Sequence, residues 1–348
     1  VRAQAASPFK AAGSPSAAWA RTLWTGPVES VGPEVLDGAG IVVDALFGAG
    51  LTRDLDGVAG DTVTALADQV GKGSLVSVAV DVPSGVDGNT GVVRGVAAAA
   101  DLTVTFFRRK PGHLLLPGRA LCGTVRVADI GIPEAVLGRI RPSLAVNGPA
   151  VWQAALGERL SSDHKYRRGH VVVVGGPMSG AGRLAIGSAR RAGVGLATAA
   201  VPHGATALFA GDAPGVIVRE VDGPQALARL LTDKRYSAIV IGPGLGGGDR
   251  PHALTAVALH AKRPLVLDAD GLNTFDGRVG DLAASIAAPT VLTPHEGEFR
   301  RLFPAVHPGV AGKLAAARLS AHETGAVTLL KGADTVIAAP DGRAVIVE

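Results

Sequence analysis

Short apolar, β-rich runs alternate with segments of helical spacing along this chain, and this alternation constrains the fold more than any other feature. In the first half, the segment from Val58 to Val70 carries apolar residues at helical spacing. The strand-like runs around it are 41–47, 75–80, 102–107 and 124–127. Strands that alternate with helices predict parallel βαβ units. We therefore expect an α/β protein built on parallel sheets.

The alternation loosens between residues 138 and 163 and then begins again. The second half has strand-like runs at 170–174, 195–201, 238–241, 265–267 and 326–330, helical segments at 181–192, 225–231, 251–261, 296–302 and 311–324, and a terminal hairpin that turns at 340–342. A length of 348 residues also exceeds one ordinary domain. We therefore predict two doubly wound domains, 1–140 and 164–348, joined by a linker at 141–163.

Charge and cysteine usage exclude several classes of function. The net charge is only +4 and no Lys/Arg block occurs, so a nucleic-acid partner is not expected. No apolar stretch reaches the roughly 18 residues of a spanning helix, so no membrane partner is expected either. Cys122 is the single cysteine, which rules out a disulfide framework and a multi-cysteine metal site. A reducing, cytoplasmic location fits this composition.

Two carboxylates stand at the ends of strand-like runs in the first half. Asp44 precedes a glycine turn at 48–50, and Asp81 precedes a Pro-Ser-Gly turn that contains Ser84. Ligands of open α/β sheets lie beyond the carboxyl ends of the strands, so both carboxylates could face one site, one of them as a general acid or base. The plainer alternatives are a strand-to-helix turn for the glycines and a helix cap or Asx turn for Asp81.

Glycine turns follow two strand-like runs of the second half. The turns at 175–182 and 242–246 suit a polyphosphate, because glycine lets backbone N–H groups approach an anion. Neither turn matches a P-loop or a clean G-x-G-x-x-G fingerprint. A third strand end carries the acidic segment at 268–273. The pair of glycine turns therefore indicates a phosphate-bearing ligand without identifying it.

A histidine and a lysine follow two further strand-like runs. His295 could face a site, although Thr293 and Glu296 have the spacing of a helix capping box with Thr293 as the N-cap. Lys331 could pair with a phosphate, or it could be the solvated lysine of an ordinary hairpin turn.

Taken in order, these motifs resemble those of the bifunctional NAD(P)H-hydrate repair enzymes, in which an epimerase domain precedes an ADP-dependent dehydratase domain. The first-half matches are DALFGAGL at 44–51, VDVPSGVDGNTG at 80–91 and TVTFFRRKPGHLL at 103–115. The second-half matches are HKYRRGHVVVVGG at 164–176, GAGRLAIGSARRAGVGLATAAVP at 180–202, IGPGLG at 241–246, LDADGLN at 267–273, TPHEGEFRRL at 293–302 and LLKGADTVIAAPDG at 329–342. The resemblance implies a Rossmann-like first domain and a ribokinase-like second domain.

For the first domain, the resemblance implies epimerisation of the R and S hydrates of NADH and NADPH. Asp81 corresponds to the substrate-contacting carboxylate and would be the catalytic acid or base. Asp44 and Ser84 correspond to ligands of a potassium ion. The residues of the substrate-contacting loop would be Gly48, Ala49, Gly50, Leu51, Thr52, Arg53 and Asp54.

For the second domain, the resemblance implies that ADP phosphorylates the hydroxyl of the S hydrate. Phosphate then leaves with help from the ring nitrogen, which restores NAD(P)H and leaves AMP. The substrate-contacting positions would be Ala181, Gly244 and His295, with Asp270 and Asn273 close by. The adenine-nucleotide loop would consist of Lys331, Gly332, Ala333, Asp334 and Thr335. The same resemblance makes Mg²⁺ a second candidate metal and implies a homo-oligomer.

The sequence departs from the family pattern at both ends. No Asn-x-Gly-Gly-Asp-Gly loop precedes Ile41, no Gly-Thr-Gly-Asp element follows the last motif, and the chain starts at Val1. We therefore expect a fragment of a bifunctional enzyme, with little or no dehydratase activity of its own. Two alternatives stay open: a small-molecule kinase of the ribokinase superfamily, which would yield a stable phosphoester, and a non-catalytic binding protein with a broken site.

Overall fold

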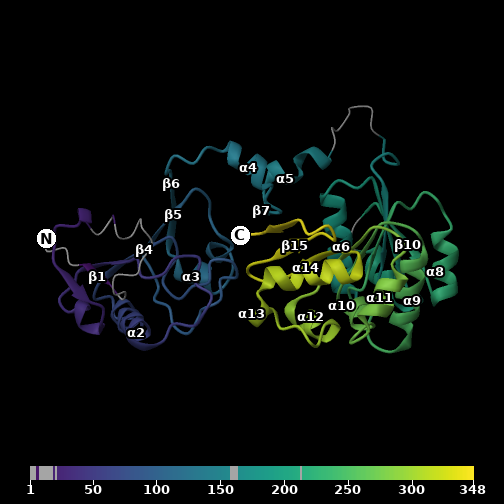
Figure 1. The fold of residues 1–348 in the computed structure, drawn as a ribbon. Coiled ribbons are helices and arrows are strands. Elements are labelled where there is room, and N and C mark those ends of the chain that lie inside the picture. Colours follow the sequence, from purple (N-terminus) through teal and green to yellow (C-terminus); the bar gives the residue numbers. More distant parts are fainter. Residues whose placement is uncertain (1–4, 8–18, 20–21, 157–163, 212–213) are drawn as a thin grey trace. The chain divides into compact units, whose positions relative to one another are not determined.

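The computed structural model describes residues 5–7, 19, 22–156, 164–211 and 214–348 (Figure 1). Contacts divide the chain into two compact units, Val1–Arg141 and Pro142–Glu348. Each unit is built on a mainly parallel sheet with helices between the strands, so the predicted α/β class is confirmed. Within the described residues, no helix is both long enough and apolar enough to span a bilayer.

The first unit contains a four-stranded parallel sheet in the order β3-β4-β5-β6. Its strands are β3 (Ile41–Asp44), β4 (Val76–Val80), β5 (Leu102–Phe106) and β6 (Thr124–Ala128). Helix α2 (Gly57–Gly71) connects β3 to β4 and buries Val63 and Leu66 in a cluster with Leu36 and Leu75. The apolar spacing of this segment therefore forms the helix that the sequence predicts.

Shorter elements complete the first unit. Strands β1 (Ala5–Ser7) and β2 (Val28–Ser30) pair in parallel in a separate ladder. The helical turns are η1 (Pro33–Leu36), η2 (Pro111–His113), α3 (Gly118–Leu121) and α4 (Ala135–Ile140). Because η2 follows β5 closely, it starts at the carboxyl end of the sheet.

The second unit contains a ten-stranded sheet in the order β10-β9-β8-β11-β12-β13-β14-β15-β16-β7. Its strands are β7 (Leu144–Val146), β8 (His170–Val174), β9 (Leu196–Val201), β10 (Val216–Glu220), β11 (Ala238–Ile241), β12 (Leu265–Leu267), β13 (Thr290–Leu292), β14 (Val327–Leu330), β15 (Val336–Ala338) and β16 (Ala344–Ile346). The strands from β10 to β14 are parallel, and β14, β15 and β16 are antiparallel neighbours. The predicted terminal hairpin is therefore confirmed.

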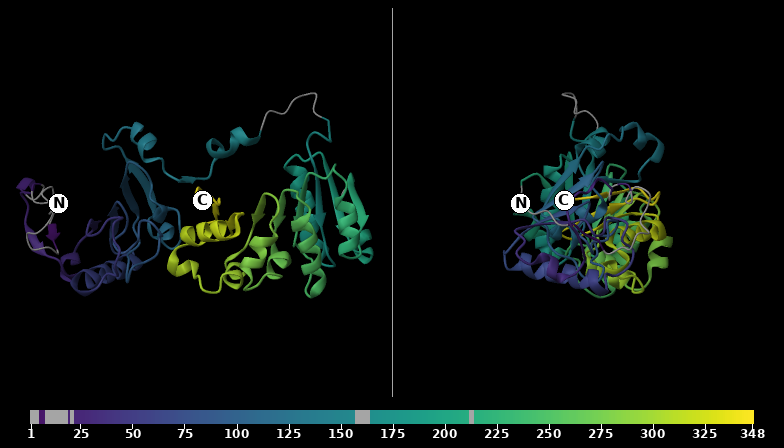
Figure 2. Two further views of the ribbon diagram at one scale, coloured as in Figure 1. Left: turned by 45° about the vertical axis from the view of Figure 1, so that its right-hand side comes forward. Right: turned by 60° about the vertical axis from the view of Figure 1, so that its left-hand side comes forward.

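Helices connect and cover these strands. They are α5 (Pro149–Trp152), η3 (Gln153–Leu156), α6 (Ser179–Arg191), η4 (His203–Ala205), α7 (Thr206–Ala210), α8 (Pro224–Leu231), α9 (Asp249–His260), α10 (Ala269–Asn273), α11 (Val279–Ser285), α12 (Glu296–Leu302), α13 (Pro308–Ala311) and α14 (Lys313–Thr324). Helix α14 packs against β14 and β15 (Figures 1 and 2).

Strand β8 lies at the point where the chain reverses its direction across the sheet. All five of its residues are buried, as a run of four valines predicts for a strand covered on both faces. From β8 the chain proceeds outward through β9 and β10, and β11 then pairs with the other side of β8. In open α/β sheets this arrangement opens a crevice at the carboxyl ends of the two central strands.

Several elements differ from the sequence prediction, among them β7, the pair α13 and α14, and β10. Strand β7 lies inside the segment 141–163 that we expected to be a linker, and it pairs with β16 at the edge of the second sheet. The helix predicted over 311–324 is divided, because Gly312 adopts a φ of 84° between α13 and α14. Strand β10 was not predicted, since its polar residues interrupt the apolar run at the sheet edge.

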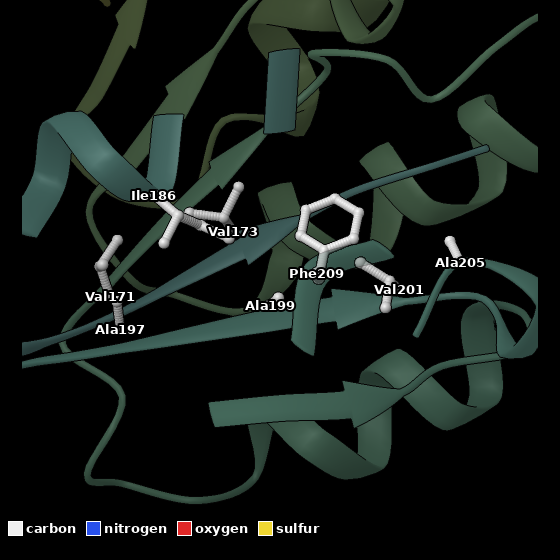
Figure 3. Close-up of a cluster of buried hydrophobic side chains, with 8 residues drawn as sticks. All are labelled: Val171, Val173, Ile186, Ala197, Ala199, Val201, Ala205 and Phe209. Atoms are coloured by element: carbon white, nitrogen blue, oxygen red, sulfur yellow. The ribbon is translucent and has the colours of Figure 1, made fainter. Parts of the chain in front are cut away.

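A cluster of buried side chains joins α6 and α7 to β8 and β9 (Figure 3). Phe209 is its only aromatic member and is 2% exposed. A Cβ atom placed on Gly175 or Gly182 would lie 3.1 or 3.0 Å from the Phe209 ring, so both glycines leave room for it. The Phe209 ring therefore fills the space between helix α6 and the end of strand β8.

Phe209→Ala should lower the free energy of unfolding of the second unit by about 3–5 kcal/mol, because it leaves a cavity in this cluster. Leu208→Ala, on the same helix but 50% exposed, is the matched control and should cost less than about 1 kcal/mol. Urea unfolding followed by far-ultraviolet circular dichroism measures both. Equal losses in the two variants would contradict the role given to Phe209.

Candidate active sites

The first unit buries a carboxylate against a serine. Asp44 ends β3, and Ser84 follows β4; the two are 4% and 0% exposed. The Ser84 backbone N–H donates to Asp44 Oδ2 at 2.7 Å, and the Ser84 hydroxyl donates to Oδ1. Burial raises the pKa of Asp44 above its usual range, and the Ser84 hydrogen bonds only partly oppose this.

Oxygen atoms gather around the Ser84 hydroxyl. Besides Asp44 Oδ1, the backbone oxygen of Phe47 lies 3.4 Å from Ser84 Oγ, and the Phe47 N–H donates to Ser84 Oγ at 3.0 Å. A buried carboxylate with hydroxyl and carbonyl oxygens beside it suits a hard cation. In the described part of the chain, no group of three or more His, Cys, Asp or Glu side chains could hold a metal.

Asp81 lies at the end of β4 in a left-handed backbone conformation, with φ at 73°. Its Oδ2 accepts the Ala49 N–H at 3.1 Å, and its Oδ1 accepts the Thr105 hydroxyl at 2.9 Å. The Lys110 ammonium lies 2.6 Å from the same Oδ1. Although burial opposes ionisation, the hydrogen bonds from Lys110, Ala49 and Thr105 together hold the pKa of Asp81 below its ordinary value. Asp81 is therefore ionised at neutral pH.

Lys110 and His113 support Asp81 from the loop after β5. Lys110 Nζ also donates to Thr105 Oγ1 at 2.8 Å and to the Phe106 carbonyl at 3.2 Å. The Lys110 backbone N–H donates to His113 Nδ1 at 2.8 Å, so the ring proton belongs on Nε2, which lies 2.7 Å from the Asp81 carbonyl oxygen. Burial lowers the pKa of His113, which keeps the ring neutral in this arrangement.

Sequence reasoning did not single out Lys110, His113 or Thr105. All three belong to the stretch 103–115, which was included in the family resemblance but given no role. The sequence could have indicated them, since a lysine and a histidine follow β5, a strand whose carboxyl end lies beside that of β4.

Only part of the loop predicted to contact substrate lies against Asp81. A Cβ atom on Gly48 would lie 3.3 Å from Asp81 Oδ2, and Ala49 donates to that oxygen. Leu51 is buried, and its N–H donates to the Gly48 carbonyl at 3.3 Å. The remaining predicted contacts, Gly50, Thr52, Arg53 and Asp54, are exposed.

In the second unit, the loops after β8 and β11 meet at the crevice beside β8. A Cβ atom on Gly176 would lie 2.2 Å from the Gly244 carbonyl oxygen, so only glycine permits this approach. Gly244 has a φ of 71° and its carbonyl accepts the Met178 N–H at 3.4 Å. Ala181 lies in the first turn of α6, next to these loops, and is exposed. The Gly246 N–H donates to Asp270 Oδ2 at 2.9 Å, which connects this loop to helix α10 after β12.

His295 and Lys331 are neighbours, as a shared site requires. The Lys331 N–H donates to the Pro294 carbonyl at 2.8 Å, and His295 and Lys331 form an isolated parallel bridge. Lys331 Nζ lies 2.8 Å from Asp268 Oδ1 and 3.9 Å from Glu298 Oε2. The lysine ammonium, expected to face phosphate, is thus held by a carboxylate from the loop after β12.

The predicted capping box at Thr293 is wrong. The N-cap of α12 is His295, whose Nδ1 accepts the N–H groups of Gly297 and Glu298 at 2.9 and 3.3 Å, while its own N–H donates to Glu298 Oε2 at 2.8 Å. The helix begins at Glu296, as predicted, but Thr293 does not cap it, since the Thr293 N–H donates to the Leu267 carbonyl of β12 at 3.1 Å. His295 is therefore fixed at the start of α12, and its Nε2 lies 3.4 Å from Glu298 Oε1, the other oxygen of the same capping partner.

The loop of residues 331–335 closes on itself. The Thr335 hydroxyl donates to the Gly332 carbonyl at 2.9 Å and lies 3.2 Å from the Gly332 N–H. Asp334 is buried and paired with Lys313, a residue that the sequence analysis did not name. Asn273 accepts a hydrogen bond from Arg301 at 2.6 Å, so its side chain also contacts protein.

A cavity of about 1040 Å³ lies along α6. It is lined by Gly180, Arg183, Leu184, Gly187, Arg190, Arg191, Val194, Gly195, Ala197 and Gly215, none of them a predicted site residue. The carboxyl ends of the central strands are the better candidate site, because Asp268, Glu298 and Lys331 gather there from the ends of β12, β13 and β14.

Comparison with known proteins identifies the family. A family model described as NAD(P)H-hydrate dehydratase matches residues 171–348, and one described as YjeF-related protein N-terminus matches residues 10–112. The chain belongs to the NAD(P)H-hydrate dehydratase family. This membership confirms the resemblance seen in the sequence and supports a ribokinase-like second domain.

Individual relatives agree with the family match. The chain is 37% identical to the bifunctional NAD(P)H-hydrate repair enzyme of Synechocystis over 89% of its own length and 60% of the relative, and 38% identical to that of Thermofilum pendens over 98% and 67%. It thus spans about three fifths to two thirds of the lengths of these relatives. Among solved structures, the ADP/ATP-dependent NAD(P)H-hydrate dehydratase of Bacillus subtilis, co-crystallised with ATP and Mg²⁺, matches at 30% identity over 57% of this chain and 71% of that one, with a TM-score of 0.49.

Ser84→Ala should lower the free energy of unfolding of the first unit by about 1–3 kcal/mol, because it removes a donor from the buried Asp44 carboxylate. The pKa of Asp44 is already raised, and the variant should raise it further. A raised folded-state pKa favours folding at acid pH and opposes it as pH rises through that pKa, so the loss should be larger at pH 7 than in mild acid.

Ser74→Ala is the matched control, since the exposed Ser74 hydroxyl donates only to the Gln69 carbonyl. Urea unfolding of both variants across the acid-to-neutral range gives the comparison. A loss for Ser84→Ala that does not change with pH would show that the hydroxyl does not stabilise the ionised carboxylate.

Proposed function

We propose that this chain repairs hydrated NADH and NADPH, with an epimerase site in the first unit and a dehydratase site in the second. The observation that carries the proposal is the constellation around Asp81: an ionised carboxylate, an ammonium and a hydroxyl at adjacent strand ends. Family membership supplies the substrate class, because both relatives named above are bifunctional NAD(P)H-hydrate repair enzymes. The single buried cysteine suits a cytoplasmic enzyme, and the family resemblance favours a homo-oligomer.

The epimerase chemistry requires inversion of configuration at one carbon. That carbon bears the added hydroxyl and is bonded to the ring nitrogen, so loss of the hydroxyl proton and cleavage of the C–N bond open the ring to an aldehyde while the nitrogen takes up a proton. Closure on the other face gives the second epimer. Asp81, ionised at neutral pH, accepts the hydroxyl proton, and Lys110, 2.6 Å away, is the donor to nitrogen.

Backbone geometry prepares Asp81 for this task. Gly48 leaves the face of the carboxylate open, since a side chain there would approach Oδ2. The His113 contact with the Asp81 carbonyl supports a left-handed conformation that costs a non-glycine residue about 1–3 kcal/mol. The strained backbone is thus held in place by a neighbouring loop rather than by the substrate.

The dehydratase site uses the crevice beside β8 for an adenine nucleotide and the hydrate. Hydroxide is a poor leaving group and phosphate a good one, so phosphorylation of the hydroxyl by ADP permits elimination, with the ring nitrogen supplying the electron pair. Residues 331–335 would hold the nucleotide, and Ala181, Gly244 and His295 would contact the hydrate. Mg²⁺, where required, would accompany the nucleotide phosphates.

Asp81→Asn should slow epimerisation by about 10²–10⁴-fold, because it removes the proton acceptor while keeping the shape of the side chain. Chromatographic separation of the R and S hydrates measures the rate at which an R-enriched sample reaches equilibrium. Asp129→Asn, an exposed carboxylate on the loop after β6, is the control and should behave as the parent.

Adding ADP to the same sample measures the dehydratase activity proposed for the second unit. NADH absorbance should appear only with nucleotide and at the expense of the S hydrate, at the low rate expected from the sequence, and Asp81→Asn should leave that rate unchanged. A stable phosphoester in place of NADH would identify a kinase, and equal epimerisation by Asp81→Asn and the parent would remove Asp81 from the mechanism.

We also propose that Asp44 and Ser84 hold K⁺, which would neutralise the buried carboxylate and orient the adjacent loop. K⁺ at 100 times its Kd should stabilise the first unit by about 2.7 kcal/mol, whereas Na⁺ at equal ionic strength should not. Asp44→Asn should abolish the difference, and Asp37→Asn, an exposed control, should retain it. Thermal unfolding in the two salts is the measurement; identical curves would exclude the site.

A further inference from the structure

A buried lysine starts helix α14. Lys313 is the first residue of the helix and is 6% exposed. Removing an ammonium from water is unfavourable, and the N-terminal end of a helix carries partial positive charge that repels a further cation. A lysine kept in such a place requires a strong compensating interaction.

That compensation comes from two carboxylates on different loops. Lys313 Nζ lies 2.6 Å from Asp334 Oδ1, and the Asp334 side chain is 8% exposed. The same ammonium lies 3.6 Å from Glu296 Oε1, at the start of α12. One charged group therefore connects the beginning of α14 to the loop after β14 and to the helix that His295 caps.

Gly332 lies directly against this ammonium. A Cβ atom at position 332 would be 2.0 Å from Lys313 Nζ, so the loop backbone passes directly over the lysine, and a side chain there would force the ammonium to move. The hydroxyl of Thr335 closes the opposite side of the same loop through the Gly332 carbonyl. The loop is thus held from inside the protein by Lys313 and across its opening by Thr335.

We propose that Lys313 is a positioning residue for the adenine nucleotide and fixes the conformation of the loop 331–335 through Asp334. The inference rests on the proposed function of the second unit. Lys313 does not touch the nucleotide in this arrangement; it acts through Asp334, whose carboxylate faces the protein interior. Asp334 is therefore an anchor of the loop rather than a nucleotide contact, which revises the role that the family resemblance implied.

The test separates loop positioning from stability by removing the charges singly and together. Lys313→Met leaves Asp334 buried without a partner and should lower the melting temperature by roughly 10 °C. The double variant Lys313→Met with Asp334→Leu leaves no buried charge of the pair and should recover most of that temperature. Lys313→Arg keeps the charge, and Lys234→Met at an exposed lysine is the control.

Calorimetric titration with ADP, and separately with ATP and Mg²⁺, provides the second readout. The double variant should bind both nucleotides at least tenfold more weakly than the parent despite its restored melting temperature, and Lys313→Arg should recover part of the affinity. In steady state, the KM for ADP should rise while the KM for the hydrate stays constant.

Two other outcomes would overturn the proposal in distinguishable ways. A double variant that recovers both stability and nucleotide affinity would show that the ion pair is structural alone. A parent chain that binds neither ADP nor ATP would refute the proposed function of the second unit, and the role of Lys313 with it. Since the double and arginine variants do not leave an unpaired buried carboxylate, misfolding of Lys313→Met would not prevent the comparison.

Discussion

The pairing of β8 with β9 on one side and β11 on the other is the constraint on which the second unit depends. It brings the loop after β8 against the loop after β11, and the approach is so close that side chains are excluded. A Cβ atom on Gly176 would lie 2.2 Å from the Gly244 carbonyl oxygen, and one on Gly242, whose φ is 122°, would lie 1.6 Å from the carbonyl oxygen of Asp268 at the end of β12. Glycine at these turns is therefore a requirement of strand order, and the crevice it leaves is a consequence of the same order.

Charged groups at both candidate sites are neutralised by partners from neighbouring strand ends. Asp81 pairs with Lys110 across β4 and β5, and Lys331 pairs with Asp268. Asp44 is the exception, because its hydrogen bonds come from a neutral serine and its pKa is raised. A buried carboxylate whose hydrogen-bond donors are all neutral would be stabilised in its ionised form by a nearby cation. The proposal of K⁺ therefore rests on Asp44 and not on Asp81.

Local sequence patterns predict the elements and the strand-end carboxylates but not their partners. The runs that become β4, β5 and β8 are apolar and continuous, so periodicity and composition suffice to locate them. Asp81 is separated from Lys110 by 29 positions and Lys313 from Asp334 by 21, and no local pattern reports such a contact. The helix cap shows the same limit: Thr293 has the right spacing, but its N–H is already used by β12, so His295 caps the helix instead.

The two proposed chemistries place different demands on their sites, and the described contacts differ in the same way. Ring opening and closure need a base and an acid that exchange protons without a leaving group, and a half-buried carboxylate beside an ammonium provides both. Phosphoryl transfer needs positioning and charge stabilisation more than covalent chemistry, and the loop 331–335 is accordingly fixed by a buried ion pair and a backbone-directed hydroxyl. In the proposed sites, the polar groups of the first unit would act on the reacting atoms, whereas the buried pair of Lys313 and Asp334 would hold the backbone of the loop 331–335 in place.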